Sequence, residues 1–217
     1  MMQDHFPFQK TPPPYSYSSL LPALDPDTVY LHCDQIYFSY VNRLNYALTP
    51  YPQFHGWTLE ELIMGEMNIP TIDQNAIRHL AGGVYNHRLY FDGLSRTPKP
   101  EPTGELRAAI DNTYGSFSNW KEIFRQATDS LLGVGWAWLN SSGDGNLSIA
   151  VTLSNKTPSL TALTPLLALD TWEHAYYLKY PADFESYLKN WFELLDWETA
   201  ERRFPASLPA KPEPPSS

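Results

Sequence analysis

The sequence predicts an α+β protein: an N-terminal α-helical hairpin followed by a C-terminal α/β lobe with a small antiparallel three-stranded sheet. Two long segments of helical periodicity, residues 28–48 and 72–94, predict the hairpin. Residues 97–104 alternate proline with polar residues, which disfavours regular structure and marks the boundary between the lobes. Short strand-like runs in the second half predict the sheet, and 217 residues of 42% hydrophobic content can bury a real core.

The N-terminal part is expected to hold an arm and the hairpin. Residues 1–27 are rich in proline and tyrosine, which predicts an extended arm on the surface. Thr28 is a candidate N-cap for the first long helix. Thr58 and Glu61 have the spacing of a capping box and predict a short helix between the two long ones. Residues 28–96 are therefore expected to form the helical hairpin domain.

The C-terminal part, residues 105–204, is expected to form the α/β domain. Its helices are predicted at residues 105–112, 118–130 and 184–203, and its strands at residues 135–140, 147–153 and 166–169. Residues 205–217 hold five prolines in thirteen positions and are expected to be a disordered tail.

Charge and composition exclude several kinds of partner. The formal net charge is −9 and basic residues are not clustered, which argues against nucleic acid. No run of 18 apolar residues exists, so no membrane partner is expected. The first residues lack the basic-then-apolar order of a signal peptide, which favours a cytoplasmic location. The one cysteine, Cys33, excludes an internal disulfide and is expected to be a buried thiol.

A carboxylate and an imidazole stand four residues apart in an apolar, aromatic segment. An apolar run predicts a buried strand ending at Asp170, and the following turn carries His174, so both side chains can converge. Burying them costs free energy unless they are paired or bind a metal. His32 and His87 lie in helical segments, and three imidazoles with one carboxylate suit iron or manganese better than structural zinc. The other histidines, expected to be solvated surface groups, are His5, His55 and His79.

Seven motifs carry a resemblance to a known family. They occupy residues 28–32, 40–45, 82–87, 114–117, 135–139, 170–177 and 187–198. The most specific is the Asp-x-Trp-Glu-His-Ala-Tyr-Tyr block that begins at Asp170. With these motifs in this order, the sequence resembles an iron/manganese superoxide dismutase from about residue 22 to residue 204.

The resemblance implies a metal centre and an activity. One iron or manganese ion per subunit would be bound by His32, His87, Asp170 and His174, with a solvent molecule as fifth ligand. The protein would form a homodimer or a tetramer. Its substrate would be the superoxide anion, converted to dioxygen and hydrogen peroxide by redox cycling of the metal.

Further roles follow from the same resemblance. Tyr40 would be the catalytic gate residue beside the bound solvent. Glu173 would reach across the dimer to a metal-binding histidine of the partner. Trp136, Trp138 and Tyr177 would wall the pocket and keep it dry.

The sequence departs from the family pattern around the ligands. The family usually has a glutamine at one of two positions, which are Gly83 and Lys156 here. A common gateway histidine is replaced by Ile36, and basic residues are replaced by Gln35 and Pro181. These changes remove an amide that tunes the metal-bound solvent and remove positive charge that attracts an anion.

Three functions remain open from the sequence. The first is superoxide dismutase activity. The second is a homolog that binds metal but is weakly active or noncatalytic and has a structural role, which the departures favour. The third is oxygen chemistry at a site like that of the two-histidine-one-carboxylate oxygenases, which four protein ligands disfavour because they leave fewer open positions.

Overall fold

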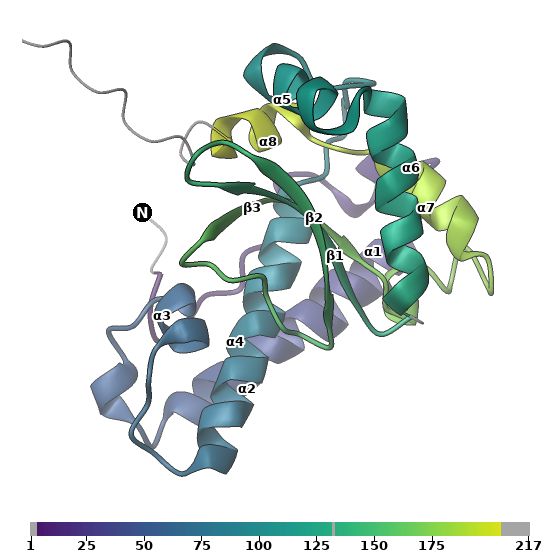
Figure 1. Cartoon of the computed structure of the whole chain (residues 1–217). Helices are drawn as coiled ribbons and strands as arrows, with labels where there is room; N and C mark the ends of the chain where they lie inside the picture. The colour runs from purple at the N-terminus through teal and green to yellow at the C-terminus, as the bar shows by residue number, and fades with distance from the viewer. Residues whose placement is uncertain (1–3, 132, 205–217) are drawn as a thin grey trace, which may run out of the picture.

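Two lobes make up the computed structural model, which describes residues 4–131 and 133–204 (Figure 1). A helical hairpin comes first, and a lobe with a three-stranded antiparallel sheet follows. This arrangement confirms the predicted α+β class. The predicted tail, residues 205–217, lies outside the described residues.

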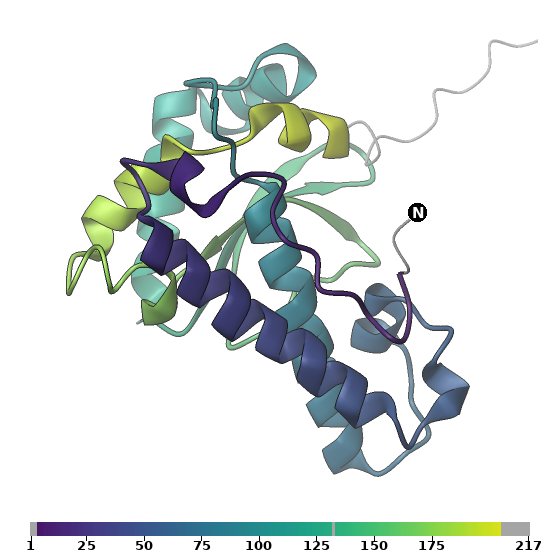
Figure 2. The ribbon, with the colours of Figure 1, turned by 180° about the vertical axis from the view of Figure 1, so that it is seen from behind.

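The hairpin consists of two antiparallel helical rods. The first rod runs through α1 (Pro26–Tyr30), a π-helical segment (Leu31–Tyr37) and α2 (Phe38–Leu48), and the second is α4 (Thr71–Asp92). The short helix α3 (Leu59–Met64) packs against α4. Figure 2 shows the first rod crossing in front of α4, with the N-terminal residues running along the hairpin.

The first rod differs from the prediction in its start and in its winding. The helix begins at Pro26, because the Asp25 carboxylate accepts a hydrogen bond from the Thr28 backbone N–H at 2.9 Å. The prediction that Thr28 is the N-cap is therefore wrong, and Asp25 is the N-cap. In the π-helical segment the Phe38 N–H donates to the Cys33 carbonyl, five residues back, a winding that frequently occurs at functional sites.

The capping box of α3 is confirmed. The Thr58 hydroxyl accepts from the Glu61 N–H at 3.3 Å, and the Glu61 carboxylate accepts from the Thr58 N–H at 2.8 Å. Cys33 is buried and free, as predicted.

The sheet has the strand order β2-β1-β3, with all pairs antiparallel. Its strands are β1 (Gly135–Ser142), β2 (Leu147–Leu153) and β3 (Leu163–Asp170). The β1–β3 register shifts between Leu139 and Asn140, and Asn140 then stands opposite Pro165. A proline has no N–H to give to the ladder, so it is tolerated at such an irregularity. Beyond it the register places Asp170 opposite Trp136.

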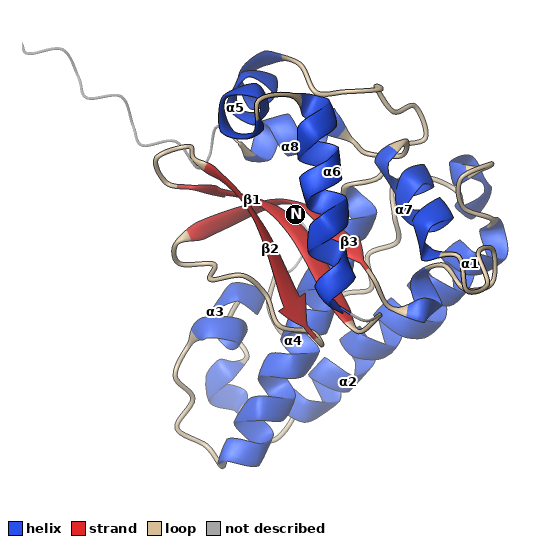
Figure 3. Cartoon of the chain, turned by 45° about the vertical axis from the view of Figure 1, so that its right-hand side comes forward, coloured by secondary structure: helices blue, strands red, loops and turns tan. Residues whose placement is uncertain are grey.

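Four helices complete the second lobe. They are α5 (Gly104–Tyr114), α6 (Phe117–Thr128), α7 (Phe184–Phe192) and α8 (Trp197–Arg203). Figure 3 shows α6 in front of the sheet and α4 behind it. Both helices contact the sheet, which is thus covered on two sides.

The prediction of a single helix at residues 184–203 is wrong, because the helix is interrupted between α7 and α8. In the break, the Asp196 N–H donates to the Gly93 carbonyl at 2.8 Å. The Asp196 carboxylate also accepts from the Thr199 N–H at 2.9 Å and so caps α8. The break therefore ties the end of the chain to the end of α4.

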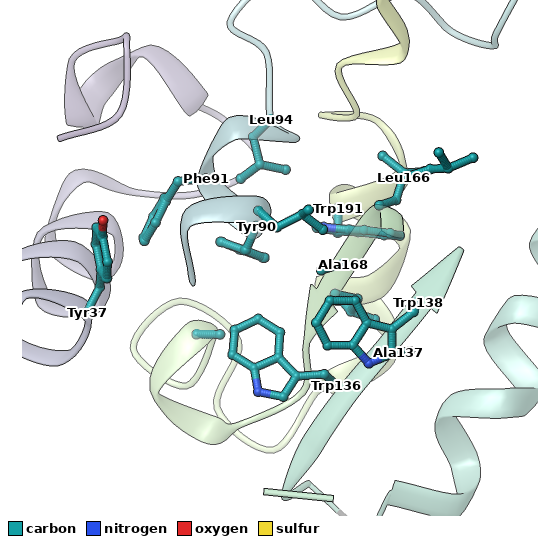
Figure 4. Close-up of a cluster of buried hydrophobic side chains, with 14 of the residues drawn as sticks. Tyr37, Tyr90, Phe91, Leu94, Trp136, Ala137, Trp138, Leu166, Ala168 and Trp191 are labelled. Atoms are coloured by element: carbon teal, nitrogen blue, oxygen red, sulfur yellow. The ribbon is translucent and has the colours of Figure 1, made fainter. Parts of the chain in front are cut away.

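A shared aromatic core joins the two lobes. Tyr90 and Phe91, near the end of α4, pack with Trp136, Trp138 and Trp191 of the second lobe, and all five are buried (Figure 4). Burial of each aromatic side chain contributes roughly 2–3 kcal/mol. This core fixes α4 against the sheet. None of the described helices is both long enough and apolar enough to span a bilayer.

Candidate metal centre

The four predicted ligands meet at the junction of the two lobes. His32 lies in the π-helical segment, His87 on α4, Asp170 at the end of β3, and His174 in a 3₁₀ turn, Glu173–Ala175. One ligand atom from each side chain lies within 4.8 Å of all the others. Each lobe thus supplies two of the four ligands.

The Asp170 carboxylate is the hub of this cluster. Its Oδ2 atom lies 3.0 Å from Nε2 of His32, 3.1 Å from Nε2 of His174 and 3.6 Å from Nε2 of His87. Its Oδ1 atom accepts a hydrogen bond from the Trp172 backbone N–H at 2.9 Å. The backbone therefore turns Oδ2 toward the three imidazoles.

The His87 ring shows that a cation fits this cluster. Its Nδ1 donates to the Gly83 carbonyl at 2.6 Å, which leaves the lone pair on Nε2. That Nε2 atom is buried and has no hydrogen-bond partner among the described residues. A buried acceptor without a donor is costly, and a metal ion supplies what it lacks. The bond to Gly83 also orients the ring, as outer contacts of metal-binding histidines do.

The electrostatics favour the protonation states that metals need. Burial lowers the pKa of His87 to about 3, helped by the neighbouring His32, and burial also lowers the pKa of His32. Burial alone would raise the pKa of Asp170, but His174 and His32 outweigh it and hold that pKa below its usual value. Neutral imidazoles and an ionised carboxylate are the forms that bind a metal.

Aromatic rings enclose the cluster. Trp136 stands edge-on to His87 with ring centroids 5.0 Å apart and so borders the cluster. Trp138 packs 6.0 Å from Trp136 and lies one layer further out. Four further ring contacts with the ligands were not predicted. Trp172 stacks on His174 and Tyr37 stacks on His87, each at 5.9 Å, while Tyr90 and Phe91 each lie 4.9 Å from the His32 ring. Trp172 stands inside the most specific motif, which was the available signal for it.

Tyr40 lies beside the cluster and fills the place of the missing amide. Its ring centroid is 5.3 Å from that of His87. A Cβ atom added to Gly83 would lie only 2.6 Å from Cδ1 of the Tyr40 ring. Because the ring occupies this space, position 83 cannot hold a larger side chain while Tyr40 stays in place.

Position 156, the second place where the family can carry the glutamine, also supplies no amide, because it is a lysine. Lys156 is exposed and so does not lie among the buried ligands. Its neighbour Asn155 is buried, and the Asn155 oxygen accepts from the Trp136 indole N–H at 3.4 Å. The amide of the buried Asn86 lies 3.2 Å from the same indole nitrogen and accepts from its N–H in the flipped amide orientation, in which the Asn86 amide nitrogen donates to the Gly82 carbonyl. Two amides that the sequence did not single out thus hold the indole against His87.

The other predicted positions lie nearer the surface. Ile36 is half-buried, and Glu173 is exposed next to His174. Tyr177 exposes about half of its side chain (48%), so it does not wall the cluster within one subunit. His55 is not a solvated group as expected: it is partly buried, stacks on Phe6 and contacts the Leu48 carbonyl at 2.9 Å.

Fold and site together define a mononuclear metalloprotein with three histidines and one aspartate shared between a helical hairpin and a sheet lobe. Two family models match: the iron/manganese superoxide dismutase alpha-hairpin domain over residues 7–95, and the C-terminal domain of the same enzymes over residues 102–203. The chain therefore belongs to the iron/manganese superoxide dismutase family, and its cofactor is one iron or manganese ion per subunit at the four ligands.

Full-length relatives agree with this assignment. The chain is 37% identical to a manganese superoxide dismutase of Listeria monocytogenes, over 89% of this chain and 96% of the relative. It is also 37% identical to one of Thermus thermophilus, over 92% of this chain and 98% of the relative. One of the manganese superoxide dismutases of Leptolyngbya boryana is 36% identical, over 91% of this chain and 81% of the relative.

Proposed function

We propose that the protein dismutates superoxide at the four-ligand centre, with Tyr40 as the gate. His32, His87, Asp170 and His174 would hold the iron or manganese, which would supply the one-electron redox chemistry by which two superoxide anions and two protons yield dioxygen and hydrogen peroxide. The observation that carries this proposal is the convergence of His32, His87, Asp170 and His174 within 4.8 Å.

The protein orients the metal ligands and shields them from bulk water. Gly83 and Trp172 fix His87 and Asp170 through backbone hydrogen bonds, which favours one ligand geometry. Burial of His32, His87 and Asp170 excludes bulk water. Tyr40 is only partly buried, so its phenol oxygen can exchange a proton between solvent and the site.

A second copy of the chain is the partner that the surface favours. Four large apolar side chains are about half exposed: Leu21, Tyr30, Tyr177 and Leu178. Three of them flank the 3₁₀ turn that carries His174, because α1 packs against that turn. Covering this patch would bring Glu173 to the metal-binding histidine of the partner subunit and would let Tyr177 wall a pocket. The cytoplasmic location remains a prediction from the sequence.

A weakly active, structural homolog is the second candidate. Ile36, Gly83 and Lys156 favour it, since none supplies the gateway imidazole or the amide that the resemblance implies. Elemental analysis and a superoxide-consumption assay on one natively purified sample separate the two candidates. Metal with activity supports the enzyme. Metal without activity supports the structural homolog, and absence of iron and manganese refutes the metal centre.

A further inference from the structure

A cavity of about 470 Å³ lies between the lobes, beside the metal centre. On the hairpin side it is bounded by α3 and the first half of α4, and on the other side by the loop that follows β2. That loop touches α4 closely, since a Cβ atom added to Gly82 would lie 2.1 Å from the Asn155 carbonyl oxygen. The lining residues are Ile63, Met64, Asn75, Arg78, His79, Ser154, Asn155, Lys156 and Thr157.

The ionisable side chains that line this cavity are all basic. Arg78, His79 and Lys156 line it, and no lining residue is acidic. The Arg78 guanidinium is held in place by a 2.6 Å bond to the Gly65 carbonyl. Among the described residues, neither Arg78 nor Lys156 forms an ion pair with a carboxylate. Their charge is therefore free to act on an anion in the cavity.

A third cation, Arg43, lies close to His79. Burial lowers the pKa of His79, and the positive charge of Arg43 lowers it further. Arg43 therefore adds to the positive potential at this side of the molecule. The whole chain carries a net charge of −9, which repels anions at long range. A local basic cavity is what could overcome that repulsion.

Two residues that line the cavity contact side chains that pack on the metal centre. The His79 ring lies 6.1 Å from the Tyr40 ring, whose other neighbour is His87. His79 Nε2 also faces the Asn155 amide nitrogen at 3.3 Å. Asn155 in turn holds the Trp136 indole that packs on His87. Tyr40 and Asn155 therefore each connect the cavity lining to His87.

We propose that this basic cavity is the capture site for a small inorganic anion, which in the working enzyme is superoxide on its way past Tyr40. The proposal rests on the proposed dismutase function. Positive charge that the resemblance places near Gln35, Ile36 and Pro181 is thus supplied by Arg78 and Lys156 from a different part of the fold. Lys156 stands where the family usually has a glutamine, and its positive charge attracts the anion instead of tuning the metal-bound solvent.

Charge substitutions at Lys156 test the capture site. Lys156→Gln and Lys156→Glu should lower kcat/KM for superoxide by about three- and tenfold at low ionic strength. The loss should disappear near 0.5 M salt, where the Debye length is only about 4 Å. A structural defect would persist at high salt. The control, Lys189→Glu on α7, makes the same charge change at an exposed site of the other lobe and should leave kcat/KM within about twofold.

Two outcomes overturn the proposal: equal rates for wild type and Lys156→Glu at low salt, or an equal loss in Lys189→Glu. Calorimetric titration of the metal-loaded protein with inorganic phosphate tests the same site without turnover. Wild type should bind phosphate at least about tenfold more tightly than Lys156→Glu, and equal binding would refute the site. If the wild type shows no dismutation, the proposed function fails, and this titration alone decides whether the cavity holds anions.

Discussion

Gly83→Ala tests the packing that replaces the missing amide. The added Cβ would lie 2.6 Å from Cδ1 of Tyr40 and 2.9 Å from both Cε1 and Cγ of the same ring. Ordinary contacts between carbon atoms begin at roughly 3.4 Å. The ring must therefore move by about 0.8 Å, the difference between roughly 3.4 Å and 2.6 Å.

Two opposing contributions set the expected change in stability. Overpacking costs about 1–3 kcal/mol, and an overlap with three ring atoms belongs at the upper end. Replacing glycine in a helix interior returns about 1 kcal/mol. The free energy of unfolding should therefore fall by about 1–2 kcal/mol. Turnover should fall about tenfold, because a shift of about 1 Å at a catalytic group can cost up to 100-fold.

Urea unfolding at fixed metal loading measures the stability change, and Gly56→Ala is its control. A Cβ atom at Gly56 meets no heavy atom within 4 Å, so this variant should stay within about 0.5 kcal/mol of wild type. In a Tyr40→Ala background, Gly83→Ala should no longer destabilise, because the obstructing ring is gone. Stabilisation by Gly83→Ala in the wild-type background, or an undiminished loss in the Tyr40→Ala background, would refute the reasoning.

Four other outcomes are expected. His87→Ala removes a ligand, so metal content by elemental analysis should fall at least about tenfold; full occupancy would contradict the ligand assignment. Tyr40→Phe keeps the ring but loses the hydroxyl, so stability and metal content should hold while turnover falls about tenfold or more; unchanged turnover would exclude a proton role. Glu173→Ala should shift the protein toward monomer in analytical ultracentrifugation, whereas Glu185→Ala, exposed on α7, should not; equal behaviour would remove Glu173 from the interface. Because the pKa of His87 is lowered to about 3, the unfolded chain, with a histidine pKa of about 6.5, binds this proton more tightly. In the metal-free protein, this contribution of His87 to the free energy of unfolding is therefore fully present above pH 6.5 and is lost as the pH falls toward 3, by about 2 kcal/mol between pH 6.5 and pH 5. Urea unfolding of the metal-free proteins at both pH values measures it, and His87→Ala should flatten the dependence; an equal slope in both proteins would contradict the burial argument.

The sequence carried enough information for the two lobes and the four ligands. Helical periodicity, the proline boundary and the strand ending at Asp170 each depend on neighbours along the chain, so they can be recognised locally. Two of the ligands could also be recognised from the free-energy cost of burial, since an Asp and a His in an apolar segment need a partner. The structure confirms both, with Asp170 Oδ2 as the hub of three imidazoles.

The features that the sequence missed depend on contacts between distant segments. The break between α7 and α8 exists because Asp196 bonds to Gly93, which lies about a hundred residues earlier. The absence of a side chain at Gly83 reads as a missing amide until the structure places the Tyr40 ring over it. His79 is exposed, as predicted, but its contact with the Asn155 amide depends on the packing of the loop after β2 against α4. No local pattern encodes such contacts.

Anomalous diffraction at the iron and manganese edges, from crystals of natively purified protein, would locate the ion that the four ligands bind. We expect one metal peak, roughly 2.0–2.2 Å from Nε2 of His32, His87 and His174 and from Oδ2 of Asp170. A peak elsewhere, or an iron- and manganese-free site in which Asp170 bonds directly to protonated histidines, would contradict this expectation.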